Sequence, residues 1–97
     1  MAKVFTRSDS TYNGWTNWET WNFKLWLDNE ESTYRVVLEL IGAKTTTMQL
    51  SRDLELWAEE MMITTGLESG FFADACNSAL RRVNFYEIAE WYLEEVE

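Results

Sequence analysis

The spacing of apolar residues along the chain predicts helices over most of its length. Apolar side chains recur at three- and four-residue intervals, the repeat that places them on one face of a helix. In the clearest segment, which begins near Thr46, the apolar residues are Leu50, Leu54, Trp57, Ala58 and Met61. The opposite face of this predicted helix is polar and holds Arg52, Glu55, Glu59 and Glu60.

Three capping signals mark where helices begin. They are Thr16-x-x-Glu19, Thr46-x-x-Gln49 and Asn84-x-x-Glu87. In such a box the first side chain accepts a hydrogen bond from the backbone N–H three residues later, and the fourth side chain reaches back to the first N–H. The Thr16 box predicts a helix that runs to about Asp28.

The helix that starts at Thr16 is apolar on most of its surface. Trp18, Trp21 and Leu25 share one face, Trp26 flanks it, and Phe23 and Leu27 lie on the far side. A narrow polar strip remains, made of Asn17, Thr20, Lys24 and Asp28. A helix so widely apolar is expected at the centre of the domain.

Three more helices complete the pattern. Asn29-Glu30-Glu31 can cap a helix that turns Tyr34, Val37, Leu38 and Ile41 inward. Residues 71–83 form a further helix with an apolar stripe of Phe72, Ala75, Cys76, Ala79 and Leu80. The last helix packs Phe85, Ile88, Ala89, Tyr92 and Val96 inward. The sequence therefore predicts an all-α fold, a compact bundle of about five short helices over residues 15–97. A flexible or extended N-terminal arm, residues 1–14, precedes it and closes in an Asn13-Gly14 turn.

The composition limits the chain to one domain and indicates the cell compartment in which we expect it. Ninety-seven residues make one domain, and six tryptophans supply enough aromatic surface to stabilise it. The single cysteine, Cys76, cannot form an internal disulfide, and the chain has no histidine to join it in a zinc site. No signal-peptide core and no membrane-spanning run is present, so we expect a protein of the cytoplasm.

The residues expected of an active site are missing. Histidine, the usual acid or base near neutral pH, is absent, and no glycine-rich phosphate loop occurs. The run Asp28-Asn29-Glu30-Glu31 lacks the alternating ligands of a calcium loop. Cys76 lies on an apolar stripe and is interpreted as a buried structural thiol. We therefore predict no enzyme, no cofactor and no metal.

Charge points to a binding function. The net charge of −9 disfavours direct contact with nucleic acid or anionic membranes. One acidic row follows the last helix, at Glu87, Glu90, Glu94 and Glu97, and a second cluster holds Glu55, Glu59 and Glu60. Such rows could imitate a phosphate backbone, or they could simply keep the helix faces solvated. Trp15 and Trp91 stand apart from the inward stripes and are candidate binding anchors, whereas the other tryptophans of the first helix are interpreted as core.

Two stretches resemble a known family. They are Asn13-Gly14-Trp15-Thr16-Asn17-Trp18-Glu19-Thr20-Trp21-Asn22, continued by Leu25-Trp26-Leu27-Asp28-Asn29-Glu30, and Val83-Asn84-Phe85-Tyr86-Glu87-Ile88-Ala89-Glu90. They look like the N-terminal and C-terminal signatures of a family of small proteins encoded by phages, plasmids and integrated elements. The resemblance implies a setting in which short acidic proteins often counter host restriction or CRISPR systems, and it implies no catalytic residue.

These observations favour a phage or mobile-element accessory protein in the host cell cytoplasm. We expect it to bind and inhibit a host protein, such as a nucleic-acid-binding defence complex, through its acidic and aromatic surface, in one version by nucleic-acid mimicry. The alternative is a non-inhibitory structural or adaptor module of a phage-encoded assembly, with a homodimer as one form. A small hydrolase that uses carboxylates ranks below both.

Overall fold

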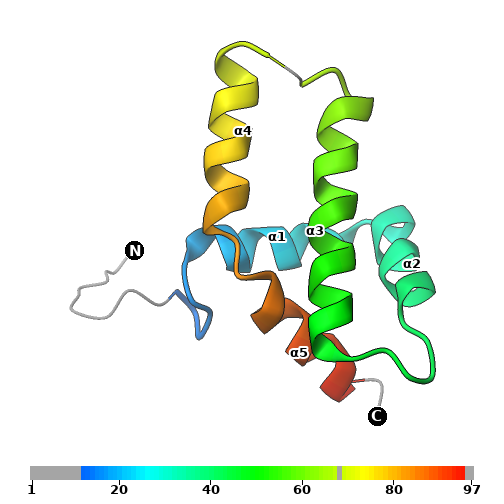
Figure 1. Ribbon diagram of the computed structural model, residues 1–97. Coiled ribbons are helices and arrows are strands. Elements are labelled where there is room, and N and C mark those ends of the chain that lie inside the picture. Colours follow the sequence, from blue (N-terminus) through cyan, green and yellow to red (C-terminus); the bar gives the residue numbers. More distant parts are fainter. Residues whose placement is uncertain (1–11, 68, 96–97) are drawn as a thin grey trace.

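A computed structural model describes residues 12–67 and 69–95, which fold into five helices (Figure 1). The helices are α1 (Trp18–Asn29), α2 (Glu31–Leu40), α3 (Thr47–Thr64), α4 (Phe71–Arg82) and α5 (Phe85–Glu95). The predicted all-α fold is confirmed. Within the described ranges, no helix combines the length and the hydropathy that crossing a membrane requires.

The core lies where α5 packs along the N-terminal half of α3, with α1 and α2 closing its sides (Figure 1). Leu50, Leu54 and Ile88 are fully buried at its centre. Its buried residues are Leu27, Val37, Leu50, Leu54, Ala58, Val83, Phe85, Ile88, Ala89 and Tyr92. The period of three to four residues therefore predicts most of the inward faces of α3 and α5 correctly. Met61 is exposed and Met62 is buried in its place, and Val96 lies outside the described residues.

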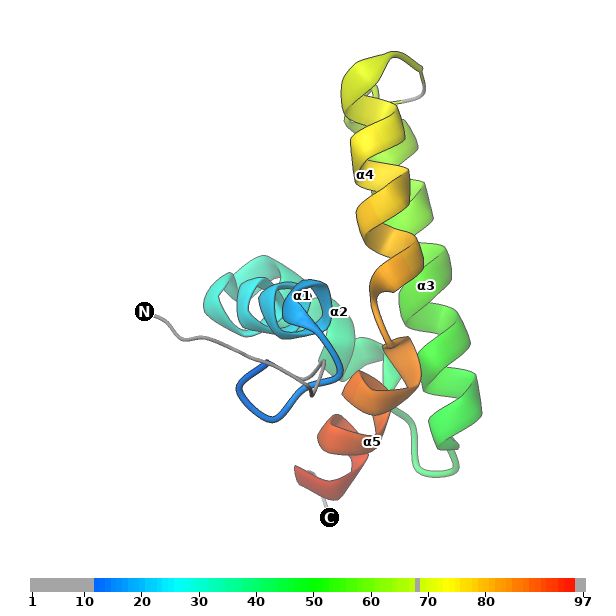
Figure 2. The ribbon, with the colours of Figure 1, turned by 90° about the vertical axis from the view of Figure 1, so that its left-hand side faces the viewer.

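Helix α4 has a different setting. It runs back along the C-terminal half of α3, and the two helices extend together beyond the other three (Figures 1 and 2). Ala73 is the only residue of α4 that is buried. Phe72 and Ala75, expected in the inward stripe, are exposed, and Cys76 is half-buried rather than buried. The prediction is wrong for Phe72 and Ala75, whereas Ala79 is half-buried and Leu80 packs against the core.

Helix α1 buries part of the strip that its pattern predicts to be polar and exposed. Its buried residues are Thr20, Lys24 and Leu27, and two of these belong to the expected polar strip. Trp18 and Leu25, expected to face the core, are exposed, and Trp26 is exposed as well. Tyr34 and Leu38 of α2 are likewise exposed, and only Val37 of that helix is fully covered.

The Thr16-x-x-Glu19 box does not form. Asn17 caps α1 instead, since its Oδ1 accepts hydrogen bonds from the backbone N–H and the hydroxyl of Thr20 at 2.9 and 2.6 Å. The backbone N–H of Thr16 donates to Glu87 Oε1 at 3.0 Å, and Glu19 pairs with Arg82. The tertiary contacts with the C-terminal part of the chain replace the local box.

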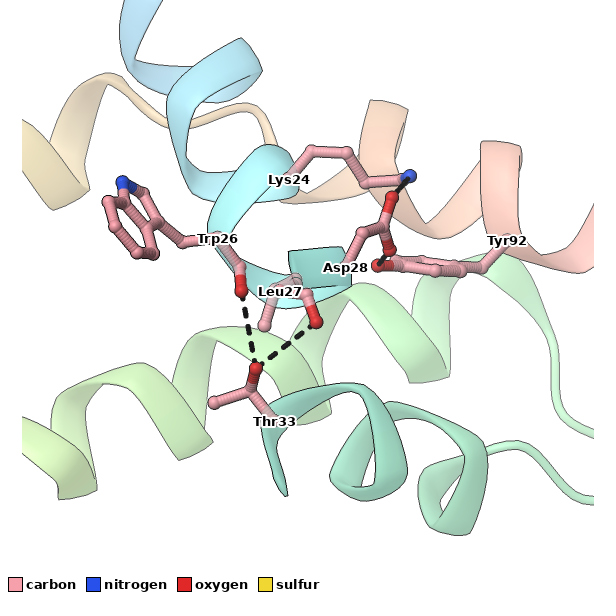
Figure 3. Close-up of polar contacts among 6 residues, drawn as sticks. All are labelled: Lys24, Trp26, Leu27, Asp28, Thr33 and Tyr92. Carbon is pink, nitrogen blue, oxygen red and sulfur yellow. Dashed lines mark hydrogen bonds and ion pairs between the residues drawn. The ribbon is translucent and has the colours of Figure 1, made fainter. Parts of the chain in front are cut away.

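The other two capping signals are confirmed at their first residue. Thr46 Oγ1 accepts a hydrogen bond from the N–H of Gln49, and Asn84 Oδ1 accepts one from the N–H of Glu87. The start of α2 has no side-chain cap, although Asn29-Glu30-Glu31 had suggested one. There the hydroxyl of Thr33 donates to the backbone carbonyl oxygens of Trp26 and Leu27, which joins α2 to the end of α1 (Figure 3).

Candidate acidic and aromatic cleft

A cleft opens between α5 and the turn that precedes α1, and it gathers five of the residues selected from the sequence. These are Trp15, Glu87, Glu90, Trp91 and Glu94, and Asn13 and Gly14 complete the lining. We call this site the acidic–aromatic cleft. Residues far apart in sequence meet here because the N-terminal turn folds back onto the last helix.

The turn is built by Asn13 and Gly14. Tyr12 and Trp15 exchange two backbone hydrogen bonds of 2.7 Å, and the two residues between them have φ values of 50° and 87°. Such left-handed backbone at two successive residues is what an Asn-Gly pair favours in a tight turn. Of the predicted arm, only residues 12–14 are among the described residues, and they form part of this turn.

A hydrogen-bond network fixes the turn against the start of α5. Besides the bond from Thr16 to Glu87, the Asn84 side chain donates to Thr16 Oγ1 at 3.1 Å, and the N–H of Asn84 donates to Thr20 Oγ1 at 2.8 Å. The Asn17 side chain donates to the carbonyl oxygen of Arg82 at 2.7 Å. All of these residues except Arg82 belong to the two stretches that carry the family resemblance. Those stretches therefore have a structural role, which is to join the N-termini of α1 and α5.

The three described carboxylates of the α5 row are not equivalent. Glu87 is half-buried and holds the N–H of Thr16, so it positions the turn. Glu90 and Glu94 are exposed and lie one helical turn apart, and neither is hydrogen-bonded or ion-paired within the part of the chain that the structure describes. Glu97 lies outside the described residues. The carboxylates open to a partner are therefore Glu90 and Glu94.

A buried cation lies beneath the tryptophans. Lys24 of α1 is buried, and its Nζ lies 3.6 Å from the ring centroid of Trp91 and 5.9 Å from that of Trp15. The same ammonium group pairs with Asp28, whose other carboxylate oxygen accepts a hydrogen bond from the Tyr92 hydroxyl (Figure 3). The charge of Lys24 is thus satisfied inside the protein, and the outer surface of Trp91 stays partly exposed.

Tyr92 is the group in this region whose ionisation is displaced. Its burial, and then its hydrogen bond to Asp28 and the negative charge of that residue, raise the pKa of Tyr92 above its ordinary value near 10. The hydroxyl therefore stays protonated even above pH 10 and remains a hydrogen-bond donor to Asp28 there.

The second predicted cluster lies elsewhere. Glu55, Glu59 and Glu60 are exposed on α3, and none of them lines the acidic–aromatic cleft. In the described part of the chain, no group of carboxylates and the cysteine is arranged to hold a metal ion.

The sequence reasoning missed a second concave surface. An apolar groove of about 360 Å³ lies between α1, α3 and α4, and Trp18, Trp26, Met61 and Cys76 contribute to it. All four had been assigned to the core or its edge. The available signal is the width of the apolar surface on the first helix, which leaves only a narrow polar strip.

Comparison with known proteins gave one finding. The sequence model of DUF7249, described as a family of unknown function, matches residues 8–97. No curated protein and no solved structure matched the chain.

Proposed function

We propose that this chain, which belongs to the DUF7249 family, is a binding module that takes up a basic segment of a partner protein in the acidic–aromatic cleft. The observation that carries the proposal is the convergence of Glu90 and Glu94 with Trp15 and Trp91 around one concavity. Carboxylates attract lysine and arginine, and tryptophan faces add cation–π attraction to an arginine side chain. The proposal includes no catalysis, cofactor or metal.

The biological setting belongs to the same proposal. A phage or mobile-element accessory protein in the host cytoplasm would use such a cleft against a host protein with a basic, nucleic-acid-binding surface. The net charge of −9 supports this choice, because it speeds approach to a basic surface and disfavours DNA, RNA and anionic lipid. Occupying that surface would inhibit a defence or nucleic-acid-processing complex. A non-inhibitory adaptor is the second candidate, and the exposed apolar groove is the observation that favours it.

The test compares two double variants with the same charge change. Glu90→Gln with Glu94→Gln alters the cleft, and Glu55→Gln with Glu59→Gln alters the exposed face of α3. The probe is a fluorescent peptide of alternating arginine and glycine, titrated at several salt concentrations. We expect the cleft variant to bind roughly tenfold more weakly, and wild-type affinity to fall as salt rises.

The α3 variant is the matched control, and it should keep most of the wild-type affinity. Equal weakening by both double variants would mean that binding follows net charge alone, and the cleft would lose its assigned role. A host protein captured from lysate by the wild type should be lost with the cleft variant and retained with the control.

A further inference from the structure

The apolar groove is a concave surface that the proposed binding at the acidic–aromatic cleft does not use. It runs between α1 and the α3–α4 pair, and its floor includes Phe23, Trp57 and Leu80. Phe72 stands four residues before Cys76 on α4, so it extends the same face of the helix past the end of the groove. Phe71 packs edge-on against Phe72, with ring centroids 5.3 Å apart. We call the groove and this extension the apolar face.

The area of the apolar face matches that of a protein interface. Four large side chains on it are substantially exposed, namely Trp18 (49%), Trp26 (56%), Met61 (39%) and Phe72 (72%). With about 150–250 Å² for each aromatic side chain, the three rings present on the order of 350 Å² of apolar surface, and Met61 adds to it. A standard interface buries roughly 800 Å² per partner, of which a little over half is apolar. Exposed patches of this size mark association surfaces on soluble proteins.

The charge on this face allows two copies of the same protein to meet. Each copy carries −9, so association through the acidic helices would bring like charges together. Among the residues that line the groove, Glu19 is the only carboxylate, and Arg82 Nε neutralises it at 3.1 Å. A basic partner would find its carboxylates at the acidic–aromatic cleft, whereas the lining of the groove offers none that is unpaired.

The shape of the face fits a two-fold arrangement. A two-fold interface uses the same patch on both subunits, so the patch must contain both a projection and a recess. Here the exposed rings of Phe72 and Trp26 stand beside a groove floored by Phe23, Trp57 and Leu80. We infer that a second copy of this chain covers the apolar face, with the α3–α4 pair of each protomer packed against that of the other. This inference does not depend on the proposed function of the acidic–aromatic cleft.

The first experiment measures mass against concentration by sedimentation equilibrium. The wild-type chain should pass from monomer to dimer, and Phe72→Glu should raise the dimer dissociation constant at least about tenfold. Leu56→Glu is the matched control, since Leu56 is exposed on α3 outside the groove and the charge change is the same. A wild-type chain that stays monomeric throughout would overturn the inference, as would equal weakening by both variants.

The second experiment uses the single cysteine as a reporter. Cys76 lines the groove and is half-buried in the monomer, so a dimer that covers this face should shield its thiol. The rate of modification by a thiol reagent should fall as wild-type concentration rises and should stay constant for Phe72→Glu. A dimer whose Cys76 reacts as fast as in the monomer would place the interface elsewhere. A monomer whose groove binds an apolar dye would show that a different occupant takes the site.

Discussion

Helices α4 and α5 are neighbours in sequence and similar in length, yet they contribute to the protein in different ways. Of its 11 residues, α5 buries Phe85, Ile88, Ala89 and Tyr92 against α1 and α3. Of its 12 residues, α4 buries only Ala73, while the rings at its N-terminus are exposed. The apolar residues of α5 therefore stabilise the fold, whereas the two phenylalanines at the N-terminus of α4 stay exposed.

Helix α1 contacts both α4 and α5, and its two sides differ as those helices do: one side is buried and the other is exposed. The side near α5 carries Thr20 and Lys24, each buried with a polar partner. The side that lines the groove carries Trp18 and Trp26, both exposed. A polar side chain can be buried cheaply when it is hydrogen-bonded, and an apolar one can stay exposed where a partner will cover it. The inverted pattern of α1 is thus consistent with one side serving stability and the other serving association.

The largest loss of stability should come from shortening a buried side chain in the core. Ile88→Ala on α5 should lower the free energy of unfolding by about 2–5 kcal/mol, because the fully buried side chain leaves a cavity. Phe72→Ala on α4 removes a larger side chain but should cost less than about 0.5 kcal/mol in the monomer, because the ring is exposed. Urea denaturation at low protein concentration measures both values. Similar losses for the two variants would abolish the distinction between the helices.

The sequence predicts the helices better than it predicts their faces. All five segments were found from spacing and capping signals, because local hydrogen bonds and periodicity act within a few residues. The α3 and α5 faces are predicted correctly except at Met61, since both helices are buried along one stripe over the residues that the structure describes. The face of α1 was wrong because its polar residues find partners from α5 and from Asn84, which no local pattern reveals.

A smaller loss of stability should come from removing the buried Thr20 hydroxyl, which accepts a hydrogen bond from the N–H of Asn84. Thr20→Val is nearly isosteric at a fully buried position, so burial of apolar area alone would predict stabilisation. We expect instead a loss of about 1–3 kcal/mol, because the N–H of Asn84 would lose its acceptor. Thr20→Ser keeps the hydroxyl and should recover most of the hydrogen-bond contribution. Urea denaturation decides the sign, and a Val variant more stable than wild type would contradict this account of α1.

The kinds of residue that form the candidate site could be predicted from the sequence. Which residues gather there, and what each does, could be predicted only in part. The acidic row on α5 and the two tryptophans outside the stripes were visible in the sequence, and the fold gathers five of these residues in one cleft. The role of Glu87 was not visible, because its bond to Thr16 joins residues 71 positions apart. The apolar face was also missed, since spacing cannot tell a covered stripe from an exposed one.

The smallest effect at neutral pH should come from the Tyr92 hydroxyl beneath the cleft, which also makes stability depend on pH above 10. The pKa of Tyr92 is raised in the folded protein, so above pH 10 the unfolded chain loses this proton while the folded chain keeps it. Stability should therefore fall as pH rises through 10, by up to about 1.4 kcal/mol per pH unit from this group. Tyr92→Phe should cost about 0.5–1.5 kcal/mol at neutral pH and should flatten that decline. Tyr86→Phe is the control because its ring is exposed, and it should leave the slope of unfolding free energy against pH as in the wild type. If Tyr92→Phe kept the wild-type slope, the Tyr92 hydroxyl would not be the group that couples α5 to α1 in this pH range.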